Sequence, residues 1–180
     1  MTYRAGDLPQ TDVLPSPASR QFHQEMADLF AGIKEDSLSR ALWSFFPEAA
    51  YDRLKSIPYP AADWHDRLVE DFSLDLAAAH RYLGQGVGTA RLLYVAVPMN
   101  EAAWIPPGYC YNSIGYWHVP GSRLVYSESG QTRSIGIASL ISWRGQWYVV
   151  HLGAVLRSSA TGIVDDPAVG QGTFGPPGGC

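Results

Sequence analysis

The first half of the chain carries apolar residues at helical spacing. The members of the first apolar stripe are spaced i, i+4, i+7, i+8 and i+11, which predicts an amphipathic helix of about 16 residues. The stripe consists of Phe22, Met26, Leu29, Phe30 and Ile33. A second helix is expected over 38–45, because Pro47 disfavours helix at the residue before it, and a third over 47–57. The longest helix is expected over 62–83, where Gly84 is suited to end it.

The second half of the chain is typical of short strands rich in β-branched and aromatic residues. These strands are expected over 90–97, 113–119, 123–127, 132–143 and 146–156. Pro120-Gly121 predicts a type II turn between the second and third strands. Arg144-Gly145 predicts a tight hairpin between the last two. Since the helices precede the strands, the expected fold class is α+β, with N-terminal helices packed on a curved antiparallel β-meander.

Both ends of the chain differ in composition from the middle. Residues 1–17 contain three prolines and few apolar residues, which predicts an extended arm. Residues 158–180 are rich in Ser, Gly and Pro and predict a flexible, solvated tail, since such a segment buries too little apolar surface to offset its ordering entropy. Residues 18–157 are therefore expected to form a single α+β domain, in keeping with a total length of 180 residues.

The charge balance limits the classes of partner. A net charge of −4 and dispersed arginines provide no basic patch, so we expect no nucleic-acid partner. No run of 18 apolar residues occurs, so we expect no transmembrane segment. The N-terminus lacks the apolar part of a signal peptide. This favours a cytoplasmic location if Met1 is native, and a secreted or cell-envelope location if a signal sequence was removed.

Cysteine and glycine patterns carry no metal or cofactor signature. The two cysteines, Cys110 and Cys180, are too few for a four-ligand zinc site. Two unpaired thiols are the simplest interpretation. The alternatives are a disulfide between the loop that holds Cys110 and the tail that ends in Cys180, or an intermolecular link through Cys180. Gly84, Gly86 and Gly88 follow a helix and lack a lysine, unlike a phosphate-binding loop, so no cofactor or metal is expected.

Aromatic rings are concentrated in the predicted sheet. Nine of the 22 rings in the chain fall between Trp104 and Tyr148, and each ring covers a large apolar area. A loop stiffened by Pro-Pro-Gly carries Trp104, Tyr109, Tyr111 and Asn112. Rigid aromatics beside an amide suit recognition of a small ligand or a peptide. A loop packed as a lid over the core is the alternative.

Two of the five histidines, His118 and His151, lie inside predicted strands. Alternation along a strand places His118 on the face of Tyr116. The same rule places His151 on the face of Trp147. If both faces turn toward the helices, the two imidazoles enter an aromatic cavity, where they can act as acid, base or hydrogen-bond donor. Local hydrogen bonding at the strand ends is the alternative, and neither predicted strand carries a carboxylate to orient an imidazole.

The closing sequence SLISWRGQWYVVHLG contains a glycine turn followed by Trp-Tyr. It resembles the final strands of the nuclear transport factor 2-like superfamily, whose fold is a cystatin-like cone. The resemblance covers about residues 18–157 and implies helices packed against a curved meander. The superfamily includes ketosteroid isomerase and dehydratases, transport factors and non-enzymatic accessory domains, and its enzymes place Asp, Tyr or His in the cone. Here no Asp falls on a predicted strand, and all helices precede the sheet, which departs from many members.

These observations favour a non-enzymatic accessory domain that binds a small apolar-polar ligand or a protein partner through its aromatic sheet face. The candidate ligand-binding residues are Trp104, Tyr109, Tyr111, Asn112, Tyr116 and Trp147. The first alternative is a small cone-type enzyme, isomerase- or dehydratase-like. Its candidate catalytic residues are His118, His151 and Tyr116, with Tyr94 as another donor. The second alternative is a structural subunit that docks through its sheet and tails, for which a homo-oligomer is expected.

Overall fold

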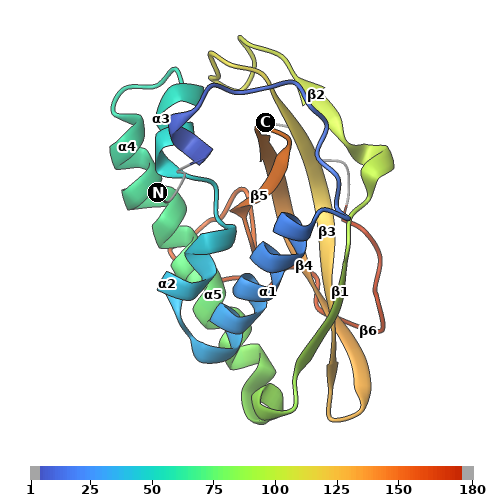
Figure 1. Cartoon of the computed structure of the whole chain (residues 1–180). Helices are drawn as coiled ribbons and strands as arrows, with labels where there is room; N and C mark the ends of the chain where they lie inside the picture. Colours follow the sequence, from blue (N-terminus) through green and yellow to red (C-terminus); the bar gives the residue numbers. More distant parts are fainter. Residues whose placement is uncertain (1–4, 176–180) are drawn as a thin grey trace.

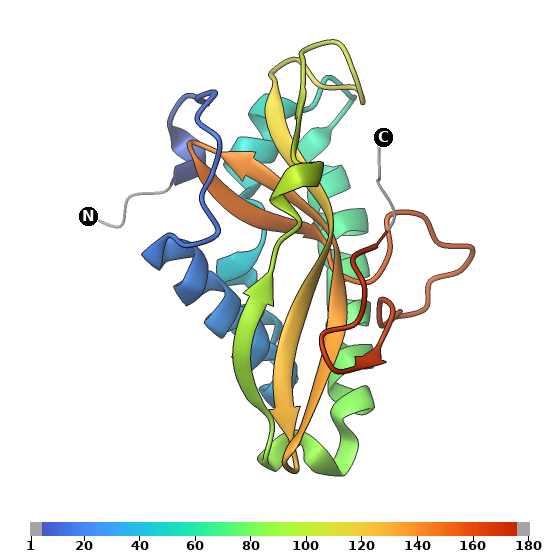
Figure 2. The ribbon, with the colours of Figure 1, turned by 90° about the vertical axis from the view of Figure 1, so that its right-hand side faces the viewer.

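The computed structural model describes residues 5–175, and its helices cover one face of a curved antiparallel sheet (Figure 1). This is the α+β arrangement that the order of helical and strand patterns predicted. Seen from a direction 90° away, the sheet stands in front of the helices (Figure 2). None of the helices within residues 5–175 combines the length and the apolarity needed to cross a bilayer.

Helix α1 (Arg20–Glu35) confirms the first apolar stripe. Ser19 caps its N-terminus, because the side-chain oxygen accepts a hydrogen bond from the Phe22 N–H at 3.1 Å. The stripe residues are at most 4% exposed, so this face of the helix packs into the core. The ring of Phe30 lies 5.4 Å from the ring of Tyr126, which connects the helix to the sheet.

The helical segments that follow are shorter or less regular than predicted. Helix α2 (Leu38–Ala41) passes into a 3-10 turn, and α3 spans Glu48–Leu54. The long helix begins as α4 (Pro60–Asp63), continues as a π-helix over Trp64–Val69 and ends as α5 (Glu70–Leu83). A π-helical turn inside an α-helix is frequent at functional sites. Here it supplies side chains to two cavities.

Two 13-residue strands, β3 (Tyr116–Glu128) and β4 (Gln131–Trp143), form the central hairpin of the sheet. The outer edge of β3 pairs with β1 (Arg91–Ala96) along one part and with β2 (Ala103–Ile105) along the other. The outer edge of β4 pairs with β5 (Gln146–His151) near the end of the hairpin that β2 also occupies. All of these pairings are antiparallel.

The predicted turn at Pro120-Gly121 is wrong, because β3 runs through both residues. Pro120 pairs with Ser139 of β4, and Gly121 adopts a φ of 63°. Pro120 lies between the part of β3 that pairs with β2 and the part that pairs with β1, so its missing N–H removes no hydrogen bond from a strand on that edge. The predicted hairpin at Arg144-Gly145 is confirmed: both residues have positive φ, 52° and 74°, and they join β4 to β5.

The described part of the C-terminal tail lies against the sheet, which corrects the prediction of a solvated tail. Strand β6 (Ala168–Val169) pairs with β4. Arg123, which is 1% exposed, donates from Nε to the Gln171 carbonyl at 3.1 Å, and the Ser134 hydroxyl donates to the same carbonyl at 2.7 Å. A buried guanidinium needs acceptors, and the tail supplies them. The composition of the tail does not reveal this demand, because it arises on another strand.

The N-terminal arm is largely extended and is held against the sheet. The indole N–H of Trp143 donates to the Ala5 carbonyl at 2.9 Å, and that of Trp117 donates to the Asp12 carbonyl at 2.8 Å. The Gln10 side chain donates to a β4 carbonyl at 3.0 Å. These contacts fix the arm where α1 and the β4–β5 hairpin meet.

Candidate functional site

Helices, sheet and the aromatic loop enclose a cavity of about 540 Å³. Its polar lining groups are Tyr51, Lys55, Arg67, Tyr111, Tyr116, His118, Ser139 and His151. Ile141 and Leu156 belong to its apolar wall. We call this space the basic cavity, because its lining contains Lys55 and Arg67 and, within the described chain, no Asp or Glu.

The register of the central strands places both strand histidines in the basic cavity. His118 of β3 pairs with Ile141 of β4, and His151 of β5 pairs with Ser139, two positions along β4 on the same face. His118 Nε2 lies 2.8 Å from Ser139 Oγ, a hydrogen bond between neighbouring strands. Both imidazoles therefore line one space, together with Tyr116.

A bulge in the β4–β5 pairing separates Trp147 from His151. Consecutive residues of β4 pair with Val149 and then with His151, which leaves Val150 as the extra residue. The bulge moves His151 to the sheet face opposite Trp147, whereas strict alternation had placed them together. Trp147 is 0% exposed and lines neither of the two cavities described here, so its ligand-binding role stays a prediction without support from these cavities.

Both imidazoles of the basic cavity are neutral at neutral pH. Burial lowers the pKa of His151 to about 4, and the nearby cations Arg67, Arg157 and Lys55 contribute to the same effect. Burial also lowers the pKa of His118. A neutral imidazole can accept a hydrogen bond or a proton from a bound molecule.

The two cations of the basic cavity differ in how they are paired. Arg67 bonds Asp63 through Nε at 2.7 Å and Nη2 at 2.6 Å, and Tyr51 donates to the same carboxylate at 2.5 Å. Lys55 Nζ instead donates to the Cys110 carbonyl, a neutral acceptor, at 2.9 Å. Burial, followed by the charge of Arg67, lowers the pKa of Lys55. Lys55 is therefore the cation that is more available to a bound anion.

The aromatic loop lies at the edge of the basic cavity, and only part of it reaches the lining. Tyr111 lines the cavity although it is 76% exposed. Asn112 is buried and donates from Nδ2 to the Tyr116 hydroxyl at 3.2 Å, which positions that ring. Tyr109 is 64% exposed and outside the lining. Trp104 also lies outside it and packs edge-on against a second indole, with centroids 5.6 Å apart.

The remaining sequence candidates have mixed outcomes. Tyr94, the other candidate donor, bonds the Gln171 side chain at 2.9 Å and is not part of the basic cavity. Cys110 lines that cavity and is not a free thiol, so the interpretation of two unpaired thiols is wrong; Cys180 lies outside the described residues, so a link between the two stays a prediction. Among residues 5–175, no group of three or more His, Cys, Asp or Glu side chains is placed to hold a metal ion.

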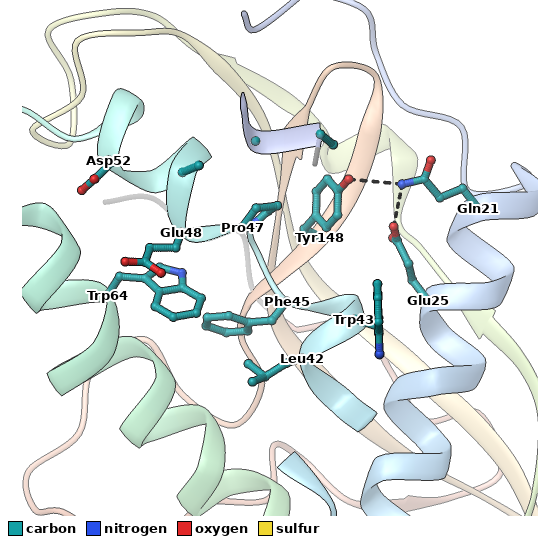
Figure 3. A pocket seen from close by; sticks show the side chains of 13 residues that line it. Gln21, Glu25, Leu42, Trp43, Phe45, Pro47, Glu48, Asp52, Trp64 and Tyr148 are labelled. Carbon is teal, nitrogen blue, oxygen red and sulfur yellow. Dashed lines mark hydrogen bonds between the residues drawn. The ribbon is translucent and has the colours of Figure 1, made fainter. Parts of the chain in front are cut away.

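A second cavity, of about 910 Å³, borders a different face of α3, and the sequence patterns did not indicate it. Its charged lining residues are Glu25 of α1 and Glu48 and Asp52 of α3, so we call it the acidic cavity. No Lys, Arg or His of the described chain lines it. Figure 3 shows Gln21 and Glu25 on α1 across the cavity from Glu48 and Trp64.

One signal in the sequence marks Glu25. It follows Phe22 by three residues and precedes Leu29 by four, so it falls on the apolar stripe of α1 rather than on the exposed face. The structure accordingly buries it, with 7% of its surface exposed. A carboxyl group on an apolar stripe is a candidate for a perturbed pKa and for function.

Comparison of the chain with protein-family models, with curated proteins and with solved structures finds no match. The resemblance to the nuclear transport factor 2-like superfamily stays a prediction.

Proposed function

We propose that the protein is a non-enzymatic binding domain whose basic cavity holds a small organic anion with an apolar body. The supporting observation is the lining of that cavity, which combines two cations and two neutral imidazoles with no carboxylate among the described residues. A volume of about 540 Å³ lies within the range of small-molecule sites. The proposal thus narrows the apolar-polar ligand expected from the sequence to one that carries a negative charge.

Lys55 forms the polar end of the proposed site. Its Nζ bonds a neutral carbonyl, so a ligand carboxylate would replace that contact with a stronger, charge-assisted hydrogen bond. Neighbouring positive charge contributes to the low pKa of His151, and a bound anion offsets that charge. Anion binding therefore raises the pKa of His151, and by linkage the anion binds more tightly as the pH falls.

Apolar side chains form the rest of the proposed site. Tyr116 and Ile141 are 7% and 5% exposed on the sheet side, and Leu156 is 90% exposed. Covering apolar surface on such side chains contributes about 25 cal/mol per Å². A ligand with a ring or a short alkyl chain next to its carboxylate fits both ends.

Three ligands that share a phenylpropyl body test the proposal: 3-phenylpropionate, the neutral 3-phenylpropanol and 3-phenylpropylammonium. Isothermal titration calorimetry should show saturable binding of the propionate, with an affinity that rises as the pH falls from about 6 to about 5. Lys55→Met should weaken this binding about tenfold or more, because it removes a charged hydrogen-bond donor.

The chain offers a matched control for this substitution. Lys34, in the last turn of α1, is the other lysine of the sequence and does not line the basic cavity. Lys34→Met should therefore leave propionate binding unchanged. Equal affinity for the propionate and the propanol, or an unaltered affinity in Lys55→Met, would contradict the proposal.

A small acid–base enzyme is the second candidate, because two neutral imidazoles and a tyrosine line one cavity. If the protein is an enzyme that transfers protons to and from carbon, 4-phenyl-2-butanone should exchange its α-hydrogens for solvent deuterium in its presence. NMR spectroscopy measures this exchange. Exchange that disappears in both His118→Ala and His151→Ala supports the enzyme, and anion binding without exchange supports the binding domain.

A further inference from the structure

The acidic cavity contains a buried carboxyl group with unused hydrogen-bonding capacity. Gln21 Nε2 donates to Glu25 Oε1 at 2.7 Å and to the Tyr148 hydroxyl at 3.2 Å, as Figure 3 shows. Glu25 Oε2 has no hydrogen-bond partner within the described residues, although Glu25 is only 7% exposed. Because buried polar atoms nearly always have a partner, Oε2 marks a position where a bound molecule can supply one.

Aromatic rings line the same cavity as Glu25. The ring centroids of Phe45 and Trp64 lie 5.9 Å apart in the wall of the cavity. Trp43 is 64% exposed, and Figure 3 shows its indole beside Glu25. The faces of aromatic rings attract cations, and the attraction is strongest for tryptophan.

The charges of the lining select the sign of the ligand. Glu48 and Asp52 complete the acidic wall, and no cation of the described chain lines the cavity. We infer that the acidic cavity binds a small primary ammonium with an apolar body, which donates to Glu25 Oε2 and packs against Trp43 and Trp64. This inference does not rest on the function proposed for the basic cavity.

Ammonium binding is coupled to the release of a proton from Glu25. Burial raises the pKa of Glu25 to about 8; the hydrogen bond from Gln21 opposes the rise, and the charge of Asp28 adds to it. The carboxyl group is therefore mostly neutral at pH 7. An ammonium next to Oε2 favours the carboxylate, so the proton leaves when the ligand enters.

Other titratable and charged groups face Glu25 or share its cavity. Asp28 and Tyr148 interact with Glu25, and Glu48 and Asp52 share its cavity; Arg40 and His65 are partners of two of these groups. Arg40 is paired with Asp28 at 2.9 Å, and His65 Nε2 lies 3.2 Å from Glu48 Oε1. Burial, together with the charge of Glu25, raises the pKa of Tyr148 to about 12, so this hydroxyl stays neutral. None of these groups supplies Glu25 with a cation of its own.

Calorimetry with 3-phenylpropylammonium tests the inference. Titrations at pH 7 in phosphate and in Tris, whose ionisation enthalpies differ, should show saturable binding with release of about one proton per ligand. The affinity should rise about tenfold per pH unit between about pH 6 and pH 8. The neutral 3-phenylpropanol should bind at least about tenfold more weakly than the ammonium, because it carries no charge for Glu25 to pair with.

Variants assign the binding to the acidic cavity. Glu25→Gln preserves size and should weaken ammonium binding about tenfold or more and abolish proton release. Glu35→Gln, exposed at the end of α1, makes the same side-chain change outside the acidic cavity and should bind like the wild type. Trp43→Ala removes an exposed ring and should weaken binding about two- to fivefold while proton release persists. Because Trp43 is exposed, its substitution should not prevent folding, so Trp43→Ala tests the location of the ammonium site if Glu25→Gln does not fold.

Three results would overturn the inference: no saturable ammonium binding, equal binding of the alcohol, or an unchanged affinity in Glu25→Gln. Phenylpropionate keeps the two proposals apart. Its binding should respond to Lys55→Met and not to Glu25→Gln, so loss of anion binding alone counts only against the function proposed for the basic cavity.

Discussion

The basic cavity and the acidic cavity border two faces of one short helix, α3, and carry opposite charges. Tyr51 and Lys55 face the basic cavity, whereas Glu48 and Asp52 face the acidic one. Glu48 and Asp52 are four residues apart within α3, which places them on the same side of the helix, whereas Lys55 directly follows the last residue of α3, Leu54. About two turns of helix therefore suffice to separate two sites that select ligands of opposite sign.

The same physical cause perturbs the buried groups of both cavities, with opposite results for the pKa. Burial lowers the pKa of His151 to about 4 and raises the pKa of Glu25 to about 8, because it disfavours the charged form of either group. Neighbouring charges add to the effect. Cations lie near His151, and the carboxylate of Asp28 lies near Glu25. Each cavity thus holds a neutral group that a bound ligand can ionise: an anion favours the protonated form of His151, and an ammonium favours the carboxylate form of Glu25.

The largest effect that would test this comparison is on stability in mildly alkaline solution. The pKa of Glu25 rises from its ordinary 4.5 to about 8 on folding, so the folded state holds the proton more tightly and stability falls as the pH rises through that interval. Glu25→Gln has no proton to lose. It should exceed the wild type in unfolding free energy by on the order of 3 kcal/mol at pH 8, and match it near pH 4.

Urea denaturation at the two pH values measures this difference, with Glu35→Gln as the control for net charge. A gain of equal size at both pH values would show that the substitution acts through packing rather than through the proton of Glu25.

The next largest effect lies on the acid side and belongs to the basic cavity. The pKa of His151 falls from 6.5 to about 4 on folding, so the unfolded state binds the proton first and the wild type loses stability as the pH falls through this interval. His151→Gln should remove about 2 kcal/mol of that loss. Denaturation between pH 7 and pH 4 measures it, and His23→Gln on the exposed side of α1 controls for the loss of an imidazole. If His151→Gln lost as much unfolding free energy between pH 7 and pH 4 as the wild type, this would argue against burial of a neutral imidazole.

A smaller effect connects Lys55 with His151 in the basic cavity. Lys55 contributes to the low pKa of His151 after burial and the arginines. Lys55→Met should therefore raise the pKa of His151 by about 0.5, which NMR titration of the imidazole signals detects. Lys34→Met should leave that titration unaltered. A pKa that does not move would mean that solvent screens Lys55 from the cavity.

The smallest effect distinguishes exposed from buried carboxylates in the acidic cavity. The Glu48 side chain is 43% exposed and pairs with His65 at the surface. Glu48→Gln should change the unfolding free energy by less than about 0.5 kcal/mol and ammonium affinity by about twofold. Denaturation and calorimetry measure the two quantities. If Glu48→Gln weakened the ammonium as strongly as Glu25→Gln, general negative charge rather than Oε2 would account for binding.

Elements with local causes were predicted well from the sequence. The apolar stripe of α1 depends on side chains within one helix, and the Arg144-Gly145 turn depends on two residues that adopt positive φ. Pro120-Gly121 carries an equally local turn signal, yet β3 continues through it. There the long pairing with β4 outweighs the preference of two residues.

The candidate site was predicted only in part. His118 and Tyr116 were correctly placed on one face, but His151 was grouped with Trp147, because the bulge at Val150 reverses alternation. The tail was expected in solvent, yet Arg123 on a distant strand binds it. In both cases the deciding contact joins segments that are far apart in the chain.

By itself, the sequence determined the order of helices before strands, the stripe that directs α1 into the core and the closing hairpin, since periodicity and turn preference act over a few residues. Only the tertiary structure decided which polar groups share a cavity. The β4–β5 pairing set His151 beside His118, and the packing of α1 on the hairpin enclosed Glu25. Burial and the sign of neighbouring charge depend on atoms brought together by folding, so the two cavities become visible only in three dimensions.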